Sequence, residues 1–311
     1  MTTVDLITGF LGSGKTTFMK KYVRFLMERG ENVCILENDF GAVNVDAMLL
    51  HGLYEDGCGI EMVSGACDKD CHKRRFKTKL IAMAMSGYTH VVIEPSGVFD
   101  VDEFFDTLRE SPLDRWYSIG SVITAVDPTL NGELSQSSEF LLASQASVAG
   151  TIVLSRCDTA SASDIRMTLD RLSSSMKKIR AEREPELYTV AKPFSELTAE
   201  DLEAIASSGC REASYVKLCG DSAVYDSVYF LGLDPSPDRL KAIASAIMSD
   251  PACGHVFRIK GFTKSGSGWV EFNATKNEMN IAPIENGQSV VIVIGEGLCK
   301  EAAEKHFKEA E

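Results

Sequence analysis

Residues 9–17 read Gly-Phe-Leu-Gly-Ser-Gly-Lys-Thr-Thr and contain the spacing G-x-x-x-x-G-K-[ST] of a phosphate-binding loop. The apolar run 4–7 before it predicts a strand, and the helical spacing of Phe18, Tyr22 and Leu26 after it predicts a helix. Such a loop directs several backbone N–H groups at one phosphate, and the helix N-terminus adds partial positive charge. The stretch therefore predicts a nucleoside triphosphate site, with a glycine-rich turn carrying an incidental lysine as the alternative.

Two side chains of this loop have specific chemical roles in the predicted site. Lys15 is expected to reach the β- and γ-phosphates, and the Thr16 hydroxyl is expected to bind Mg²⁺. The remaining nucleotide-binding positions predicted in the loop are Gly12, Ser13, Gly14 and Thr17.

The predicted strand 33–36 runs directly into a segment with two acidic side chains, Glu37 and Asp39. Acidic groups at the carboxyl end of a strand beside a phosphate loop are well placed to hold Mg²⁺ or its waters. We assign a metal-binding role to Glu37 or Asp39, with Asp46 as a further candidate. The alternative is an ordinary polar junction between a strand and a loop.

A second strand with an acidic end is predicted at 89–93, which runs into Glu94-Pro95-Ser96-Gly97. An apolar strand ending in an acid, with a glycine three residues later, is typical of the second half of a phosphate-loop hydrolase site. Glu94 would hold the Mg²⁺ shell or orient the attacking water, and the Gly97 N–H would contact the γ-phosphate. A strand that simply ends in a turn is the alternative.

Residues 51–72 contain a concentration of metal-ligand side chains. Cys67, Cys71 and His72 precede a helical pattern, so they are expected in a loop at a helix N-terminus, where thiolates are favoured. Two thiolates with one imidazole suit Zn²⁺ and tolerate Co²⁺ or Ni²⁺. The alternative is two structural thiols and a surface histidine. The same region also contains His51 and Cys58.

The predicted strand 151–154 leads into Ser155-Arg156-Cys157-Asp158, where a guanine-reading loop belongs. The Asp158 carboxylate could accept the N1 and N2 hydrogens of guanine, and Arg156 could lie flat on the base. Asp158 could instead cap the helix from Ala162 onward. The segment 191–193 is a candidate for a loop that closes over the base.

The order of predicted elements divides the chain into two domains. Strands alternate with helices over 1–208, which predicts an α/β domain: a P-loop parallel sheet with helices on both faces. From 209 to 311 strands follow one another, which predicts a smaller α+β domain with an antiparallel sheet, suited to partner recognition or dimer contact. Cys253 and His255 in this domain are expected to be isolated structural groups.

Composition excludes several classes of protein. The chain has 311 residues, 44% of them hydrophobic and 25% charged, and a formal net charge of −13, which argues against a nucleic-acid partner. No apolar run approaches the roughly 18 residues of a membrane span, and no signal peptide is recognised, so we expect a cytoplasmic protein. Its nine cysteines are then expected to be free thiols or metal ligands.

Taken together, these motifs resemble those of the CobW/HypB/UreG family of GTPases, and most closely the CobW branch. The resemblance spans nearly the whole chain, because the pattern 290–295 before the last helix is similar to the end of the family's C-terminal domain. The other matching stretches are 7–17, 37–41 with 44–46, 94–97 and 258–262.

The resemblance implies a Mg²⁺-dependent GTPase that binds GTP and GDP, with a transition metal such as Zn²⁺ or Co²⁺ as cargo. It also implies a client metalloprotein and a nucleotide-dependent homodimer. Two motifs depart from the family pattern. The family's Gly-Cys-x-Cys-Cys is replaced by residues 65–71, Gly-Ala-Cys-Asp-Lys-Asp-Cys, and its Asn-Lys-x-Asp has Ser155 and Arg156 in the first two positions. Cys58, His72 or Glu37 could replace the missing thiol.

Three functions are compatible with these motifs. The first is a metal-inserting GTPase whose hydrolysis is slow, because no glutamine follows Gly97, where Val98 stands. The second is a GTPase that remodels or reactivates a cofactor-dependent client enzyme without carrying metal. The third is a nucleotide-binding module without turnover, against which the intact Lys15, Thr16 and Glu94 argue.

Overall fold

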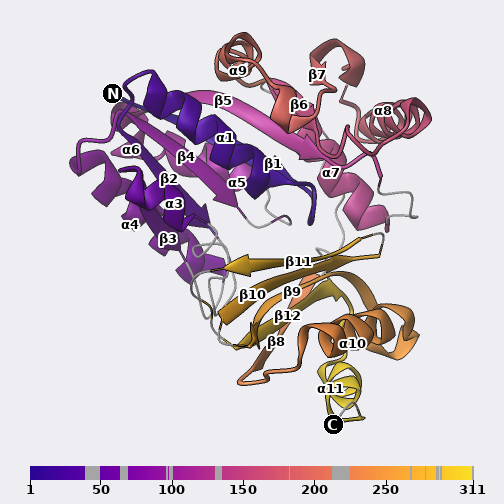
Figure 1. Ribbon diagram of the computed structural model, residues 1–311. Coiled ribbons are helices and arrows are strands. Elements are labelled where there is room, and N and C mark those ends of the chain that lie inside the picture. The colour runs from indigo at the N-terminus through magenta and orange to yellow at the C-terminus, as the bar shows by residue number, and fades with distance from the viewer. Residues whose placement is uncertain are drawn as a thin grey trace. The chain divides into compact units, whose positions relative to one another are not determined.

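The computed structural model describes residues 1–38, 50–63, 69–95, 97, 101–129, 135–181, 183–211, 225–266, 268–276, 278–284, 287 and 289–309. The chain divides into two compact units, Met1–Cys219 and Gly220–Glu311 (Figure 1). The boundary expected from the sequence, between residues 208 and 209, stays a prediction.

The first unit is built on a seven-stranded sheet with the order β3-β2-β4-β1-β5-β6-β7. Each pair of neighbouring strands is parallel, so the carboxyl ends of all the strands meet at one edge of the sheet. The strands are β1 (Thr2–Gly9), β2 (Val33–Asn38), β3 (Gly59–Val63), β4 (His90–Pro95), β5 (Tyr117–Val126), β6 (Thr151–Leu154) and β7 (Thr189–Val190).

Helices cover both faces of this sheet, as Figure 1 shows. Successive residues of a strand point to opposite faces, so Leu6 and Ile7 belong to different cores. The core of Leu6 includes residues from the four helices between 69 and 148, and that of Ile7 includes residues from the helices 15–28, 51–55 and 199–206. The predicted α/β fold is therefore confirmed. The helices are α1 (Lys15–Glu28), α3 (His51–Glu55), α4 (Lys69–Met85), α5 (Val101–Arg109), α6 (Leu113–Trp116), α7 (Gln136–Val148), α8 (Ala162–Lys178) and α9 (Ala199–Ala206), with 3₁₀ turns η1 (Pro185–Tyr188) and η2 (Phe194–Glu196).

A buried carboxylate joins four elements of the first unit. Asp5 lies within β1 and is fully buried. Its Oδ2 accepts a hydrogen bond from the Tyr22 hydroxyl of α1 at 2.6 Å and lies 2.7 Å from Nε2 of His90, at the start of β4. Its Oδ1 accepts from the backbone N–H of Ser121 in β5 at 2.6 Å. The network fastens the helix that follows the phosphate loop to the strand that precedes it.

The second unit is a five-stranded antiparallel sheet with the order β11-β10-β9-β12-β8, so the predicted antiparallel α+β domain is also confirmed. Apolar residues of two helices share a core with this sheet, and the rings of Phe230 and Phe307 lie 4.5 Å apart. The elements are β8 (Tyr225–Leu231), α10 (Pro237–Ser249), η3 (Pro251–Cys253), β9 (His255–Ser265), β10 (Gly268–Thr275), β11 (Met279–Ile284), β12 (Val290–Glu296) and α11 (Lys300–Glu309).

Two local predictions differ from the structure. Residues 187–190 are predicted from the sequence to form a strand, but residues 185–188 form the turn η1, and only Thr189 and Val190 pair with β6. The α8 helix is capped by Ser161, whose side chain and that of Asp164 form a reciprocal capping box. Asp158 therefore does not cap this helix.

Candidate nucleotide-binding site

The phosphate loop connects β1 to α1 in a conformation that requires glycine. Gly12 and Gly14 have φ angles of 77° and 85°, in the left-handed region that side chains with a Cβ rarely adopt. A Cβ on Gly14 would also lie 3.0 Å from Cβ of Ser155, at the end of β6. The backbone is thus free to curl at the N-terminus of α1, as phosphate binding requires.

The two loop side chains that are predicted to bind phosphate and Mg²⁺ have well-defined partners. The Lys15 ammonium is buried in the loop, where it donates to the carbonyl oxygens of Gly9 at 3.0 Å and Phe10 at 3.3 Å. The Thr16 hydroxyl donates to Oε1 of Glu94 at 2.8 Å. Two residues that are 78 positions apart in the sequence are thereby joined in one site.

Two carboxylates lie side by side at the same edge of the sheet. Glu37 and Glu94 are the penultimate residues of β2 and β4, and the two are direct partners in the parallel pairing of these strands. Both are buried, with 3% and 5% of their surface exposed. The neighbouring Asn38 is fully buried, and its amide forms no hydrogen bond with any described residue. The site thus contains oxygen ligands of the kind that hard cations prefer.

Gly97 packs directly against the phosphate loop. A Cβ at this position would lie 2.7 Å from the backbone nitrogen of Leu11 and 3.0 Å from its Cα. Only glycine permits this approach without moving the backbone. The segment after β4 is therefore in contact with the loop after β1.

Arg156 connects the end of β6 to the phosphate loop. Its guanidinium forms an ion pair with the buried carboxylate of Asp127, at the end of β5, and donates to the carbonyl oxygen of Gly12 at 3.4 Å. Asp127 also accepts from the backbone N–H and the hydroxyl of Thr129, each at 2.8 Å. No role was predicted for Asp127 from the sequence. Its position directly after the apolar run 117–126 could have indicated one, because acidic residues that follow strands are often found in phosphate-loop sites.

The structure also describes the other segments that are predicted to bind the base. Asp158 is exposed, two residues beyond Arg156. Phe194 follows the segment 191–193, and its ring lies within 3.5 Å of the position that a Cβ on Gly14 would take. Lys21 of α1 donates to the Phe194 carbonyl at 2.5 Å, while Lys192 pairs with Asp201 of α9. Sequence analysis missed the contact of Phe194 with the phosphate loop.

The structure describes only some of the predicted Mg²⁺ and transition-metal ligands. Asp39, Asp46 and Cys67 lie outside the described residues. Cys71 and His72 belong to the first turns of α4, so the prediction that they lie in a loop before the helix is wrong. His72 is fully buried, which also excludes the alternative of a surface histidine. Helical structure extends one turn further toward the N-terminus than the apolar spacing indicated.

The fold and the loop define a P-loop nucleotide-binding protein. The family model for the CobW/HypB/UreG nucleotide-binding domain matches residues 3–184. The chain therefore belongs to the CobW/HypB/UreG family.

Similar proteins include the zinc chaperones YeiR and YjiA of Escherichia coli, each 28% identical, over 159 and 165 residues. These matches cover 51% and 50% of this chain, and the chain spans about half the length of the curated relatives it matches (47% and 50%). The crystal structure of Zn(II)-bound YjiA GTPase from E. coli is 17% identical and aligns with 100% of this chain and 99% of its own, with a TM-score of 0.42.

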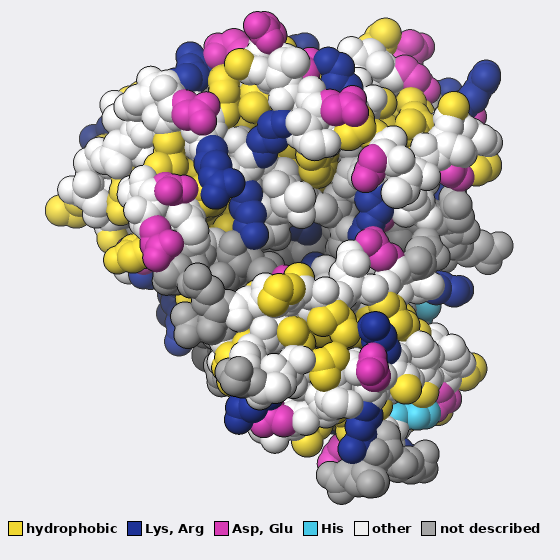
Figure 2. All heavy atoms as spheres, viewed as in Figure 1, with side chains coloured by type: hydrophobic (Ala, Val, Ile, Leu, Met, Phe, Trp, Pro, Cys, Tyr) yellow, Lys and Arg dark blue, Asp and Glu magenta, His cyan; other side chains and the backbone are white. Residues whose placement is uncertain are grey.

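The helices and the surface charge of the described residues bear on what the protein can contact. No helix among the described residues is long and apolar enough to cross a membrane. On the face drawn in Figure 2, acidic and basic side chains are interspersed over the surface of the described residues.

Proposed function

We propose that this chain is a Mg²⁺-dependent GTPase that couples slow GTP hydrolysis to the handling or insertion of a transition metal. The observation that carries the proposal is the 2.8 Å hydrogen bond from Thr16 to Glu94, made beside the buried carboxylate of Glu37. In the proposal, Thr16 and Glu94 are both Mg²⁺ ligands, and Glu37, a candidate ligand for the metal cargo, is the partner of Glu94 on the neighbouring strand.

The side chains of Thr16 on α1 and Glu94 on β4 fit a Mg²⁺ ion. The Thr16 hydroxyl and the Glu94 carboxylate are oxygen donors within hydrogen-bonding distance of one another, and Asp39 would complete the set. When bound, Mg²⁺ would neutralise charge on the β- and γ-phosphates. The chain itself would hold these phosphates with loop N–H groups and Lys15, and Glu94 would orient the attacking water.

The response to loss of the γ-phosphate and the selection of the base would depend on different residues. Gly97 touches Leu11, so loss of the γ-phosphate at the Gly97 N–H would be transmitted to the segment after β4. The Asp158 carboxylate would accept from guanine. Because the Arg156 guanidinium is engaged by Asp127 and Gly12, the aliphatic stem of Arg156 would be the part that lies against the base.

The transition metal would be bound as cargo by Glu37 together with Cys67, Cys71 and His72. Glu37 is in register with Glu94, so a change at the nucleotide site acts directly on a neighbouring ligand. The relatives named zinc chaperones support this part of the proposal, with Zn²⁺ or Co²⁺ as the cargo. A client metalloprotein would receive the metal, and two copies of the chain would pair around the nucleotide.

Phosphate release from GTP, measured with and without Mg²⁺, tests the enzymatic part. Glu94→Gln is expected to slow hydrolysis by about 10²-fold while GTP still binds, because a positioned general base contributes about 10²–10⁴-fold. Glu61→Gln is the matched control, since Glu61 lies on β3 and pairs with Lys79. Equal rates in both variants would refute the role of Glu94, and binding without any turnover would favour the nucleotide-binding module.

The metal-handling part is tested separately, by comparing hydrolysis with and without Zn²⁺ or Co²⁺ in the unmodified chain and in Cys67→Ser. Coupling predicts a metal-dependent change of rate in the unmodified chain that Cys67→Ser abolishes. Identical rates throughout would refute coupling and favour a GTPase that remodels its client without carrying metal.

A further inference from the structure

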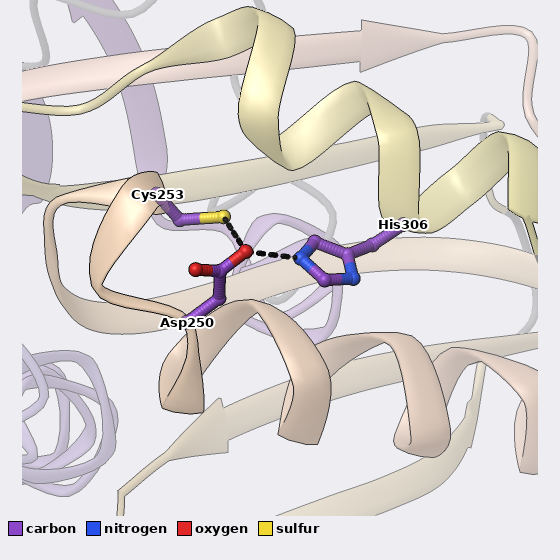
Figure 3. A group of neighbouring side chains, drawn as sticks. All are labelled: Asp250, Cys253 and His306. Carbon is purple, nitrogen blue, oxygen red and sulfur yellow. Dashed lines mark hydrogen bonds and ion pairs between the residues drawn. The ribbon is translucent and has the colours of Figure 1, made fainter.

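Three side chains in the second unit come together although they are far apart in sequence. Asp250 follows the last residue of α10, Cys253 ends η3, and His306 lies on α11. Figure 3 shows them turned toward one another, with the Asp250 carboxylate between the thiol and the imidazole. One ligand atom from each lies within 4.8 Å of the other two, and this group is unique in that respect among the described residues.

The distances within the group are close to those of a metal site. Oδ2 of Asp250 lies 2.8 Å from Nε2 of His306 and 3.9 Å from Sγ of Cys253. Ligand atoms about 2.0–2.3 Å from a tetrahedral Zn²⁺ are separated from one another by about 3.3–3.6 Å. These two distances lie on either side of this range, so the Asp250–His306 pair would have to open, and the Asp250–Cys253 pair to close, by about half an ångström to admit the ion.

We propose that Asp250, Cys253 and His306 bind a divalent transition-metal ion of the Zn²⁺ class, at a site separate from the one formed around Glu37. One thiolate, one imidazole and one carboxylate form a mixed donor set that suits Zn²⁺ or Co²⁺ and disfavours Mg²⁺ and Ca²⁺. Three protein ligands leave a coordination position for water or for a ligand from another molecule.

The surroundings of the three side chains are suited to such a site. Cys253 is buried, while the side chains of Asp250 and His306 are 33% and 21% exposed, which gives an ion a route from solvent. An ion held there would fasten α11 to the end of α10.

A purely structural role makes a different prediction. Oδ1 of Asp250 accepts from the Ala252 N–H at 2.9 Å, and Oδ2 pairs with His306, so the carboxylate could serve only to cap η3 and hold α11. That role needs no thiol, whereas the metal site requires Cys253 as a ligand. Spectroscopy that detects a metal–sulfur bond therefore separates the two.

The test uses Co²⁺ as the probe, in the full-length chain carrying Cys67→Ser and Cys71→Ser so that the other predicted thiols are removed. We expect a saturable thiolate-to-cobalt absorption band that Cys253→Ser abolishes. His306→Gln is expected to weaken Co²⁺ binding at least about tenfold, since loss of even an outer-shell partner costs about 10–100-fold. The matched control is His255→Gln, because His255 is exposed and pairs with Glu296 outside the group.

A second readout covers variants that are less stable. The rise in melting temperature caused by Zn²⁺ is expected in the background chain and in His255→Gln, and is expected to be lost in Cys253→Ser and His306→Gln. No cobalt–thiolate band in the background chain, or a band that persists in Cys253→Ser, would overturn the proposal. Because this site is independent of the proposed function, GTP hydrolysis should be unaffected by His306→Gln whichever result is obtained.

Discussion

Replacing Tyr22 with phenylalanine removes one hydroxyl from the buried network that joins α1 to β1. The hydroxyl donates to Oδ2 of Asp5 at 2.6 Å, and both residues are fully buried. Burial and then the Asp5 carboxylate raise the pKa of Tyr22, so its hydroxyl stays protonated and donates at every ordinary pH. Phenylalanine keeps the ring, whose centroid lies 5.7 Å from that of Phe18, so the change isolates the hydrogen bond.

The magnitude follows from what remains after the substitution. A hydrogen bond to a charged group contributes about 1.5–3 kcal/mol, and Asp5 keeps its contacts with Ser121 and His90. We therefore expect Tyr22→Phe to lower the free energy of unfolding of the first unit by about 2 kcal/mol. Two comparisons calibrate this value. Tyr117→Phe removes a bond to the neutral carbonyl of Leu80 and should cost about 1 kcal/mol. The exposed Tyr54→Phe should change stability by less than about 0.5 kcal/mol.

Urea unfolding followed by tryptophan fluorescence measures these differences. The chain has two tryptophans, and Trp116 lies in the first unit while Trp269 lies in the second, so a Trp269→Phe background reports on the first unit alone. With a urea m-value of about 3 kcal/mol per molar, 2 kcal/mol shifts the midpoint by about 0.7 M. A Tyr22→Phe midpoint no lower than that of Tyr117→Phe would refute the reasoning.

Two further predictions concern the nucleotide site and the thiols. Gly97→Ala would place a Cβ 2.7 Å from the Leu11 nitrogen, so it should slow GTP hydrolysis by about 10²-fold. Gly52→Ala on α3 should leave the rate unchanged, because its Cβ would make only an ordinary contact with the Arg24 side chain, at 3.9 Å. Equal rates in the two variants would contradict the contact of Gly97 with Leu11. Burial raises the pKa of Cys34 to about 12, so its thiol should react slowly at pH 8. Iodoacetamide should therefore modify Cys34 far more slowly than the partly exposed Cys71, and peptide mass spectrometry would measure the two rates. Equal labelling of the two cysteines would disprove the burial of Cys34.

Much of the first unit could be predicted because its signals are local. The loop 9–17, its strand and its helix are neighbours in the sequence, and the acidic end of β4 is marked by the apolar run before it. The start of α4 was placed too late because its first turn is polar, so apolar spacing carries no information there. Strand β11 was missed for a similar reason, since its residues are largely exposed and it is defined by pairing with β10.

The sequence by itself determined that this chain has a phosphate loop, a parallel α/β unit and a second antiparallel unit, because periodicity and motif spacing are properties of neighbouring residues. Only the tertiary structure decided which distant side chains meet. Arg156 pairs with Asp127, and Cys253 joins Asp250 and His306, because strand order and helix packing bring those segments together. Contacts of this kind depend on the packing of the whole unit, and no local pattern in the sequence encodes them.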